Sequence, residues 1–564
     1  MKLSTSQISL SLACVLAAGA LPVAAQAQQI EAESLGEPGY DSVSVSHRSA
    51  SAGRVMQVTP YIEAAQVLSA QIDPGNDVVT YSSVAAGVDA VIAGRNSAAS
   101  VSLRYERRFG WDDKANDGDV ISGVARASLA VIPQAVTLEA GALASRSRVE
   151  GNGAALANGF GGDTSSTSQV WSAYVGPSVN ARLGDFDLQG HYRFGYTRVE
   201  QPDALVLVPG AQPVDLFDEG TTHAAQASIN LRPNTALPIG LGVGGGWNEQ
   251  HISNLDQRIR DRFVRGGVTV PLTNTAALVG GVGYEDVEIS SGDALRDGLG
   301  NPVIGTDGRY VTNDAAPRQI AYETDGLIWD AGLMWRPSSR TSAEAHVGRR
   351  YGSTTYSGSL TYAPDARSTL ALAGYDNVSS LGGQLVNTLA GLPTQFSAFR
   401  NPISGEVGGC VASLQGGNCI NGALGSFRSS VYRSRGIAAS YAMDLGALQL
   451  GTGVGYDRRT FIAAPGTVLA AANGVVDETI WLAAYATARI DERSSLTTNA
   501  AMNWFESGFD LSSDAIGYST SLSYQRNLFR GLTGTAAVGL DGITRDTLPD
   551  FMSASALLGM RYSF

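Results

Sequence analysis

The chain has 564 residues, of which 44% are hydrophobic and 16% are charged, and its formal net charge is −13 at pH 7. The charged fraction is low against about 25% for ordinary soluble domains. The acidic balance argues against nucleic-acid binding. Five His and three Cys leave little material for a metal cluster, so we expect neither a metal nor a cofactor.

The first 27 residues have the pattern of a secretory signal peptide. Lys2 precedes an apolar run from Ile8 to Ala25, and Ala25-Gln26-Ala27 forms a small-x-small cleavage site. No apolar run of 18 or more residues follows, so we expect the mature chain to leave the cytoplasm without stopping in the inner membrane as a helix. Residues 28–54 are predicted to be a short periplasmic lead, with no room for a folded plug ahead of residue 55.

From about residue 55 to residue 564 the chain shows one pattern, in which apolar and polar residues alternate with period 2. This alternation predicts strands whose apolar face meets lipid and whose other face meets a wet lumen. Tight turns alternate with longer polar connections, among them 200–221, 290–321 and 377–428. We therefore predict an all-β transmembrane antiparallel barrel of about 22 strands (range 18–24), without a plug domain, in the bacterial outer membrane.

Charged side chains recur on the face opposite the apolar one. They are predicted to face the lumen, either as a ladder of ion pairs that stiffens the wall or as a surface for polar, anionic polymers. The candidates are Arg104, Glu106, Arg126, Glu139, Arg193, Arg232, Asp330, Arg336, Glu344, Arg350 and Arg561.

Aromatic, histidine and cysteine residues allow three further predictions. Aromatic residues near the predicted strand ends, Tyr61 among them, suit girdles at the membrane interface. His191 and His346 lie on the predicted lumen face, but we interpret them as solvated histidines and expect no catalytic residues. Cys410 and Cys419 are expected to form a disulfide in an oxidising compartment.

The last strand is the most regular one. In residues 552–564 apolar residues alternate with mostly small or polar ones and end on Tyr562 and Phe564, the pattern of a closing strand that outer-membrane barrels use as an assembly signal. We expect the partners to be outer-membrane lipid and the barrel-assembly machinery.

Part of the chain resembles a known family. Gly283-Tyr284-Glu285-Asp286, Trp335-Arg336-Pro337-Ser338-Ser339-Arg340-Thr341, Gly348-Arg349-Arg350-Tyr351-Gly352 and Tyr356-Ser357-Gly358-Ser359-Leu360 are similar to the core of the PEP-CTERM-system-associated outer-membrane barrel family. Its genes accompany exopolysaccharide and exosortase clusters. The resemblance implies a role in polysaccharide export or surface attachment, with polysaccharide or export-system proteins as partners, and it supplies no catalytic residues.

The leading hypothesis is therefore a non-enzymatic conduit or docking component for exopolysaccharide, whose long loops could fold inward. Three alternatives stay open: a general diffusion porin, a structural or adhesive barrel with a filled lumen, and a barrel enzyme that uses His191 or His346 as a base.

Overall fold

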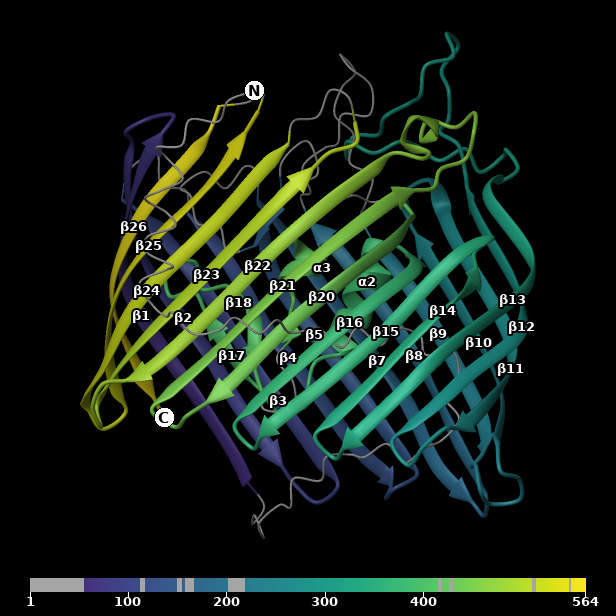
Figure 1. Ribbon diagram of the computed structural model, residues 1–564. Coiled ribbons are helices and arrows are strands. Elements are labelled where there is room, and N and C mark those ends of the chain that lie inside the picture. The colour runs from purple at the N-terminus through teal and green to yellow at the C-terminus, as the bar shows by residue number, and fades with distance from the viewer. Residues whose placement is uncertain are drawn as a thin grey trace, which may run out of the picture.

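The computed structural model describes residues 55–111, 117–149, 155–157, 167–200, 219–413, 418–426, 430–509, 514–546 and 549–564. The predicted signal peptide and the lead at 28–54 lie outside the described residues. The main sheet has 23 strands in the described residues; β6 (Ala155–Ala157) pairs only with the end of β5, and the other 22 form one antiparallel ring. Figure 1 shows this ring from the side.

The 22 strands of the wall follow one another around the ring in chain order. They are β1 (Val55–Asp73), β2 (Val78–Ala93), β3 (Ser97–Gly110), β4 (Gly118–Ile132), β5 (Val136–Val149), β7 (Thr167–Leu183), β8 (Phe186–Glu200), β9 (Glu219–Leu231), β10 (Gly240–Ile252), β11 (Gln257–Pro271), β12 (Ala276–Ser291), β13 (Gln319–Ser338), β14 (Thr341–Arg350), β15 (Ser353–Asp365), β16 (Ser368–Ser379), β20 (Tyr432–Asp444), β21 (Leu448–Phe461), β22 (Val476–Arg489), β23 (Ser494–Glu506), β24 (Ala515–Phe529), β25 (Leu532–Arg545) and β26 (Phe551–Ser563).

The ring closes between its first and last strands. β1 pairs with β2 on one side and with β26 on the other, with Tyr61 opposite Ser563 and Ala70 opposite Ala554. Closure leaves no open sheet edge, so backbone groups of the wall can be satisfied even in lipid.

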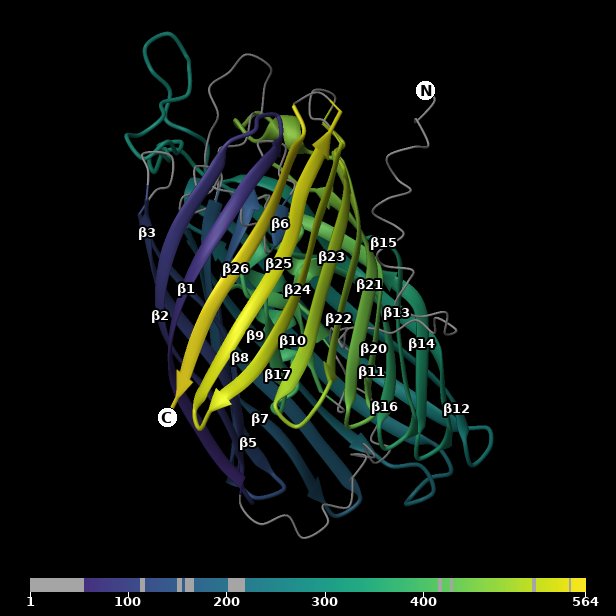
Figure 2. The same cartoon turned by 90° about the vertical axis from the view of Figure 1, so that its left-hand side faces the viewer.

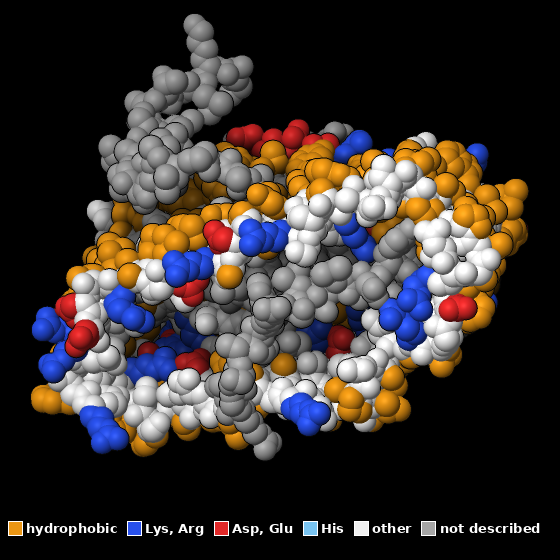
Figure 3. All heavy atoms as spheres, turned by 60° about the horizontal axis from the view of Figure 1, so that its bottom comes forward, with side chains coloured by type: hydrophobic (Ala, Val, Ile, Leu, Met, Phe, Trp, Pro, Cys, Tyr) orange, Lys and Arg blue, Asp and Glu red, His pale blue; other side chains and the backbone are white. Residues whose placement is uncertain are grey.

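The two faces of the wall differ as the alternation predicts. In β13, the outward residues Leu327 and Trp329 are 79% and 49% exposed. The next residue, Asp330, points inward and is 7% exposed. The same pattern runs through the other strands, and Figure 3 shows apolar side chains around the outside with charged side chains inside the rim. The outer face is thus suited to hydrocarbon and the inner face to polar groups.

The connections at the two ends of the ring differ in length. Residues 366–367 join β15 to β16 at the lower end in Figure 1, while residues 292–318 join β12 to β13 at the upper end. The short 3-10 helices η1 (Asn254–Asp256) and η2 (Ala470–Ala472) belong to upper connections. No helix in the described part of the chain is long and apolar enough to cross a membrane.

One upper connection turns into the ring. After β16 the chain forms α2 (Leu381–Ala390), β17 (Ser397–Arg400), β18 (Val407–Ala412), β19 (Asn418–Cys419) and α3 (Asn421–Leu424) before it rejoins the wall at β20. β17, β18 and β19 make a separate three-stranded sheet. Figures 1 and 2 show these elements enclosed by the wall. We call residues 380–413 and 418–426 the plug.

The prediction that the barrel has no plug domain is therefore wrong. The sequence reasoning looked for a plug ahead of residue 55, whereas this one is inserted between the fifteenth and sixteenth strands of the wall, within the connection predicted at 377–428. Its apolar residues are buried against the inner face, which gives the lumen a packed interior.

Candidate functional site

The upper part of the plug has an apolar core. Leu385, Val386 and Leu389 of α2 are at most 1% exposed and belong to one buried cluster with the wall. Burying each such side chain stabilises the folded state by about 1.5–3 kcal/mol. The plug is therefore a packed element and not a loose loop. The wall residues in this cluster include Val124, Leu143, Val170, Val199, Ile252, Ile259, Val287 and Ile289.

A glycine in the wall allows α2 to come this close. A Cβ at Gly195 of β8 would lie 2.4 Å from Cγ2 of Val386, which is closer than packed carbon atoms approach. Gly195 thus lets the helix lie directly on the inner face of β8.

The N-terminus of α2 is fixed by a polar contact with the wall. Ser380 caps the helix, since its Oγ accepts a hydrogen bond from the backbone N–H of Gly383. Ser380 in turn donates from its backbone N–H (3.0 Å) and from its Oγ (2.7 Å) to Oε1 of Gln250 in β10. One wall glutamine therefore holds the residue that begins the helix.

The C-terminus of α2 is held by hydrogen bonds from a wall arginine. Arg126 of β4 donates hydrogen bonds to the backbone carbonyls of Ala390 (3.1 Å) and Leu392 (3.2 Å). A cation here also matches the negative end of the helix dipole. The same guanidinium pairs with Glu139 at 2.7 Å, which keeps it in place.

The lower part of the plug is held by β17 and the turn that follows. Arg400 donates to Oγ of Ser122 (2.7 Å), to Oγ of Ser102 (3.1 Å) and to the carbonyl of Gly405 (2.9 Å). Burial lowers the pKa of the Arg400 guanidinium, because β17 lies inside the ring. Arg108 of the wall donates to the carbonyl of Ser404 at 3.0 Å.

The turn after β17 favours glycine at position 405. Its φ of +75° lies in the left-handed region that favours glycine, and a Cβ would lie 2.0 Å from Nη1 of Arg104. The backbone thus fits directly against the guanidinium of a wall arginine.

A charge network surrounds this turn. Arg104 pairs with Glu63 (3.0 Å) and with Glu106, and Arg146 pairs with Glu406 of the plug at 3.2 Å. Burial raises the pKa of the Glu406 carboxyl, against the lowering effect of Arg146. Buried charges that stay paired and hydrogen-bonded hold one geometry, since removing one partner is costly.

The remaining predicted lumen residues lie elsewhere on the wall. Asp330 accepts from Arg265 (2.6 Å) and from His346 (3.2 Å), and the other imidazole nitrogen of His346 lies 2.5 Å from Glu344. Both nitrogens of His346 are thus engaged in hydrogen bonds. The other positions are as follows: Arg350 pairs with Asp261 and Glu285, Arg561 with Asp89, and Arg232 with Asp187, while His191, Arg193 and Arg336 are half-buried and interacting.

The cysteines and the closing aromatics occupy separate places. The backbone sets Cys410 of β18 opposite Cys419 of β19, a spacing that suits a disulfide, and the bond itself stays a prediction. Tyr562 and Phe564 are exposed on the outer face, with ring centroids 5.1 Å apart. Their part in assembly stays a prediction too.

The inner face of β24–β26 differs from that of β3–β5. Most of its inward positions carry small side chains, although Asp541 of β25 and Leu557 at the middle of β26 are larger, and Leu557 belongs to one buried cluster with Ile403 of the plug. These small residues are Gly517, Ser519, Ser521, Ser523, Ala537, Gly539, Ser553, Ser555 and Gly559.

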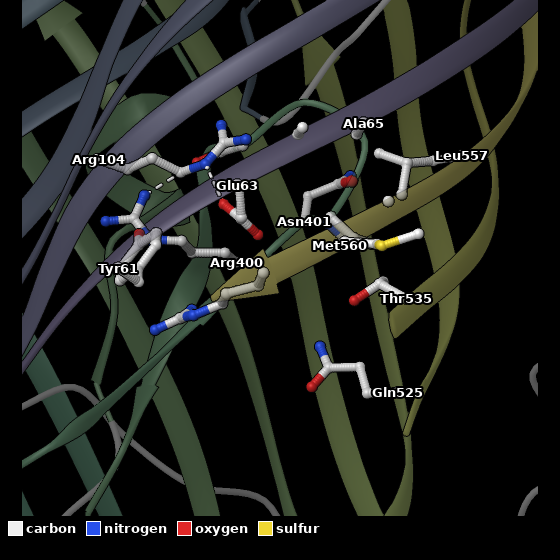
Figure 4. Close-up of a pocket in the computed structure, with 15 residues that line it drawn as sticks. Tyr61, Glu63, Ala65, Arg104, Arg400, Asn401, Gln525, Thr535, Leu557 and Met560 are labelled. Atoms are coloured by element: carbon white, nitrogen blue, oxygen red, sulfur yellow. Dashed lines mark hydrogen bonds and ion pairs between the residues drawn. The ribbon is translucent and has the colours of Figure 1, made fainter. Parts of the chain in front are cut away.

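A hollow lies between the lower plug and this part of the wall. It is lined by Tyr61, Arg104, Arg400, Asn401 and Gln525, among others, and about 600 Å³ of its space is free of protein atoms, part of it open to solvent. Figure 4 shows these side chains around the hollow, which also reaches Thr535.

Tyr61 was expected in a membrane-interface girdle, and this interpretation is wrong. Its side chain is 1% exposed and lies on the inner face, with the guanidinium of Arg561 3.5 Å from its ring centroid. Sequence alone did not reveal which of the adjacent apolar residues Tyr61 and Ile62 points outward, because both suit lipid.

Sequence reasoning also missed Gln250, Arg400, Gly405 and Glu406. A local signal for part of the plug was present: Ser380 precedes Leu381, Leu385 and Leu389 at helical spacing, and Gly391 follows. No local pattern indicates that this helix lies in the lumen, since Arg126 and Ala390 are 264 residues apart.

No family model and no curated protein matches the chain. Solved structures align with most of it. They include the open form of the ferric-catecholate import receptor Fiu from E. coli K12 (TM-score 0.43, 11% identity, 89% of this chain and 81% of that chain). The siderophore receptor PiuA from Acinetobacter baumannii has a TM-score of 0.39 at 8% identity over 91% of this chain and 82% of its own. We draw no conclusion about this chain from likeness at these TM-scores.

The outer surface of the ring indicates the cellular location of the protein. The ring is closed, its strands are long, and its outward residues are exposed leucine, valine and aromatic side chains. Closed antiparallel rings with an apolar outer face are the strand-built structures that span lipid. The protein is an outer-membrane β-barrel of a bacterium, as predicted, and its lumen contains a plug that is part of the same chain.

Proposed function

We propose that the protein is a non-enzymatic conduit or docking component for an extracellular polysaccharide, closed at rest by the plug. The observation that carries the proposal is the asymmetric seating of the plug. β3, β4 and β10 hold it through the hydroxyl groups of Ser102 and Ser122, which accept from Arg400 of the plug, and through Arg126 and Gln250, whereas β24–β26 offer mostly small side chains.

Two features support a polysaccharide as the ligand. The inner face carries hydroxyl, amide and guanidinium groups that can hydrogen-bond to sugars. The resemblance of residues 283–360 to the exopolysaccharide-associated barrels favours the same class of ligand.

A filled structural barrel is the second candidate, and the apolar core around α2 favours it. In that case the plug would never leave, and the upper connections would carry the function. Only the lumen of a conduit is expected to discriminate between an anionic and a neutral polymer, so single-channel recording of a barrel without the plug separates the two candidates.

The test uses a variant in which residues 381–426 are replaced by a short Gly/Ser linker, recorded in a planar bilayer. We expect polygalacturonate to reduce its current and a neutral dextran of similar length to reduce it less. A current that is indifferent to both polymers would favour a general porin and contradict the proposal.

A further inference from the structure

We propose that the outer face of the wall, at the upper ends of β14, β20 and β21, binds the phosphate groups of a lipid in the outer leaflet of the membrane. The site is a basic patch made of Arg349, Arg433, Arg435 and Arg458. The inference concerns the outside of the barrel, so it does not depend on the function proposed for the lumen.

The patch lies directly above the apolar band of the outer face. On β20 the exposed Ile437 is followed, toward the upper end, by the outward residue Arg435. On β21 the outward residues in the same direction are Val454, Tyr456 and Arg458. Figure 1 shows β20 and β21 side by side, with longer connections above them. A change from aliphatic to aromatic to cationic side chains is typical of the depth at which hydrocarbon meets the lipid headgroups.

Two of the arginines are fixed by one carboxylate. Asp376 of β16 has a fully buried side chain, whose oxygens accept from Nε of Arg433 (2.6 Å) and from Nε of Arg435 (3.1 Å). Nη2 of each guanidinium also donates to the carbonyl of Thr354 in β15, at 3.4 Å from Arg433 and 3.0 Å from Arg435. Both side chains are therefore held in place before a ligand arrives, which reduces the entropic cost of binding.

The patch has positive charge and N–H donors left over. Asp376 supplies a single negative charge to two guanidinium groups. The side chain of Arg435 is 32% exposed, and its Nη1 has no acceptor among the described residues. Arg349, which stands opposite Thr354, is exposed, and no carboxylate in the described part of the chain lies within 4.0 Å of its guanidinium. These groups can donate outward to an anion.

The register of the strands adds a repulsion that an anion would relieve. Arg435 of β20 stands directly opposite Arg458 of β21. Like charges in this arrangement destabilise a sheet. Glu478 pairs with Nε of Arg458 at 3.3 Å, but it belongs to β22, on the side of Arg458 away from Arg435. The space between the two arginines is therefore suited to a negative group.

A lipid phosphate matches both the charge and the position of the patch. Guanidinium groups bind phosphate through paired N–H donors. The exposed Val347 and Ile437 lie one outward step below Arg349 and Arg435, on β14 and β20. The acyl chains of a lipid would cover these apolar residues, whereas a free phosphate ion would leave them bare. The ligand is therefore assigned as a phosphorylated lipid.

The experiment is native mass spectrometry of the full mature chain in detergent. The probes are bisphosphorylated lipid A, the same lipid after dephosphorylation, and inorganic phosphate. We expect the wild-type barrel to bind the bisphosphorylated lipid at least about tenfold more tightly than the dephosphorylated one, because several cations contribute. Inorganic phosphate should not displace the lipid, since it makes no apolar contact.

Single substitutions test the position of the site. Arg435→Gln and Arg458→Gln should each weaken binding of bisphosphorylated lipid A about fivefold, and the second leaves the contacts of Asp376 intact. Arg107→Gln is the matched control, because Arg107 lies on the outer face near the upper end of β3 and already pairs with Asp119 at 2.9 Å. It should change the affinity by less than about twofold.

Three results would overturn the inference: equal binding of the phosphorylated and dephosphorylated lipids, an equal loss in Arg107→Gln and Arg435→Gln, or displacement of the lipid by inorganic phosphate. Heat-modifiability of each variant shows that its barrel is folded. None of these measurements involves the plug or a polymer, so a failure here is distinguishable from a failure of the proposed function.

Discussion

The inner faces of β3–β5 and of β24–β26 both consist of strands with alternating inward and outward residues, but their contacts with the plug differ. β3–β5 present Arg104, Arg108, Arg126 and Arg146, whose guanidinium groups contact the carbonyls or carboxylates of the plug or pack against its turn. β24–β26 present mainly serine, glycine and alanine. The side at β3–β5 therefore fixes the plug through charged and hydrogen-bonded contacts, whereas the side at β24–β26 shares one apolar cluster with Ile403 of the plug and leaves a hollow beside it.

The largest effect is expected where β4 holds the end of α2. Arg126→Ala leaves the carbonyls of Ala390 and Leu392 without their donor and Glu139 without its cation, which should cost the docked plug about 3 kcal/mol. Hydrogen exchange of the α2 amides should report this as faster local opening. Arg232→Ala, which removes an ion pair with Asp187 at the other end of the wall, is the matched control and should leave α2 exchange unchanged.

A somewhat smaller effect is expected at the lower turn of the plug. Gly405→Ala combines a left-handed backbone with a contact against Arg104 and should weaken docking by about 2–3 kcal/mol. Gly446→Ala shares the positive φ, at +81°, but its Cβ would meet open space. If both variants changed trypsin cleavage of the plug equally, the contact with Arg104 would have no role.

A third comparison concerns the start of α2. Gln250→Leu removes the acceptor for Ser380 and should cost about 1–2 kcal/mol, because the N–H and hydroxyl of the capping residue are then buried without a partner. Exchange at residues 381–385 should rise more than exchange at residues 386–390. Uniform change along the helix would contradict a local anchoring role.

The smallest effect is expected on the other side of the wall. The Oγ of Ser521 is buried and has no hydrogen-bond partner among the described residues, so Ser521→Ala should be neutral within about 0.5 kcal/mol. Thermal unfolding and plug exchange should both match the wild type. A loss comparable to that of Arg126→Ala would remove the contrast between the two sides.

The wall could be predicted because its signal is local. Alternation such as that of Leu327, Trp329 and Leu333 around Asp330 sets which face meets lipid, and the outer-membrane location that it implied is confirmed. The orientation of Tyr61 could not be obtained in this way, because it depends on the register between β1 and β26.

The site could not be assembled from the sequence for a related reason. Arg104, Arg126 and Glu106 were placed on the lumen side by alternation, but the plug carbonyl that Arg126 contacts, that of Ala390, lies 264 residues away in the chain. Arg400 and Glu406 fall in a connection without period-2 alternation. Only the packed structure brings these groups together.

The central claim is that the plug closes the lumen, and conductance tests it most directly. The full mature chain and the variant with residues 381–426 replaced by a short linker would be recorded side by side in planar bilayers, after heat-modifiability confirms that both barrels are folded. We predict a nearly silent wild type and large, steady channels in the variant. Equal conductance from the two folded barrels, whether large or absent, would contradict the claim.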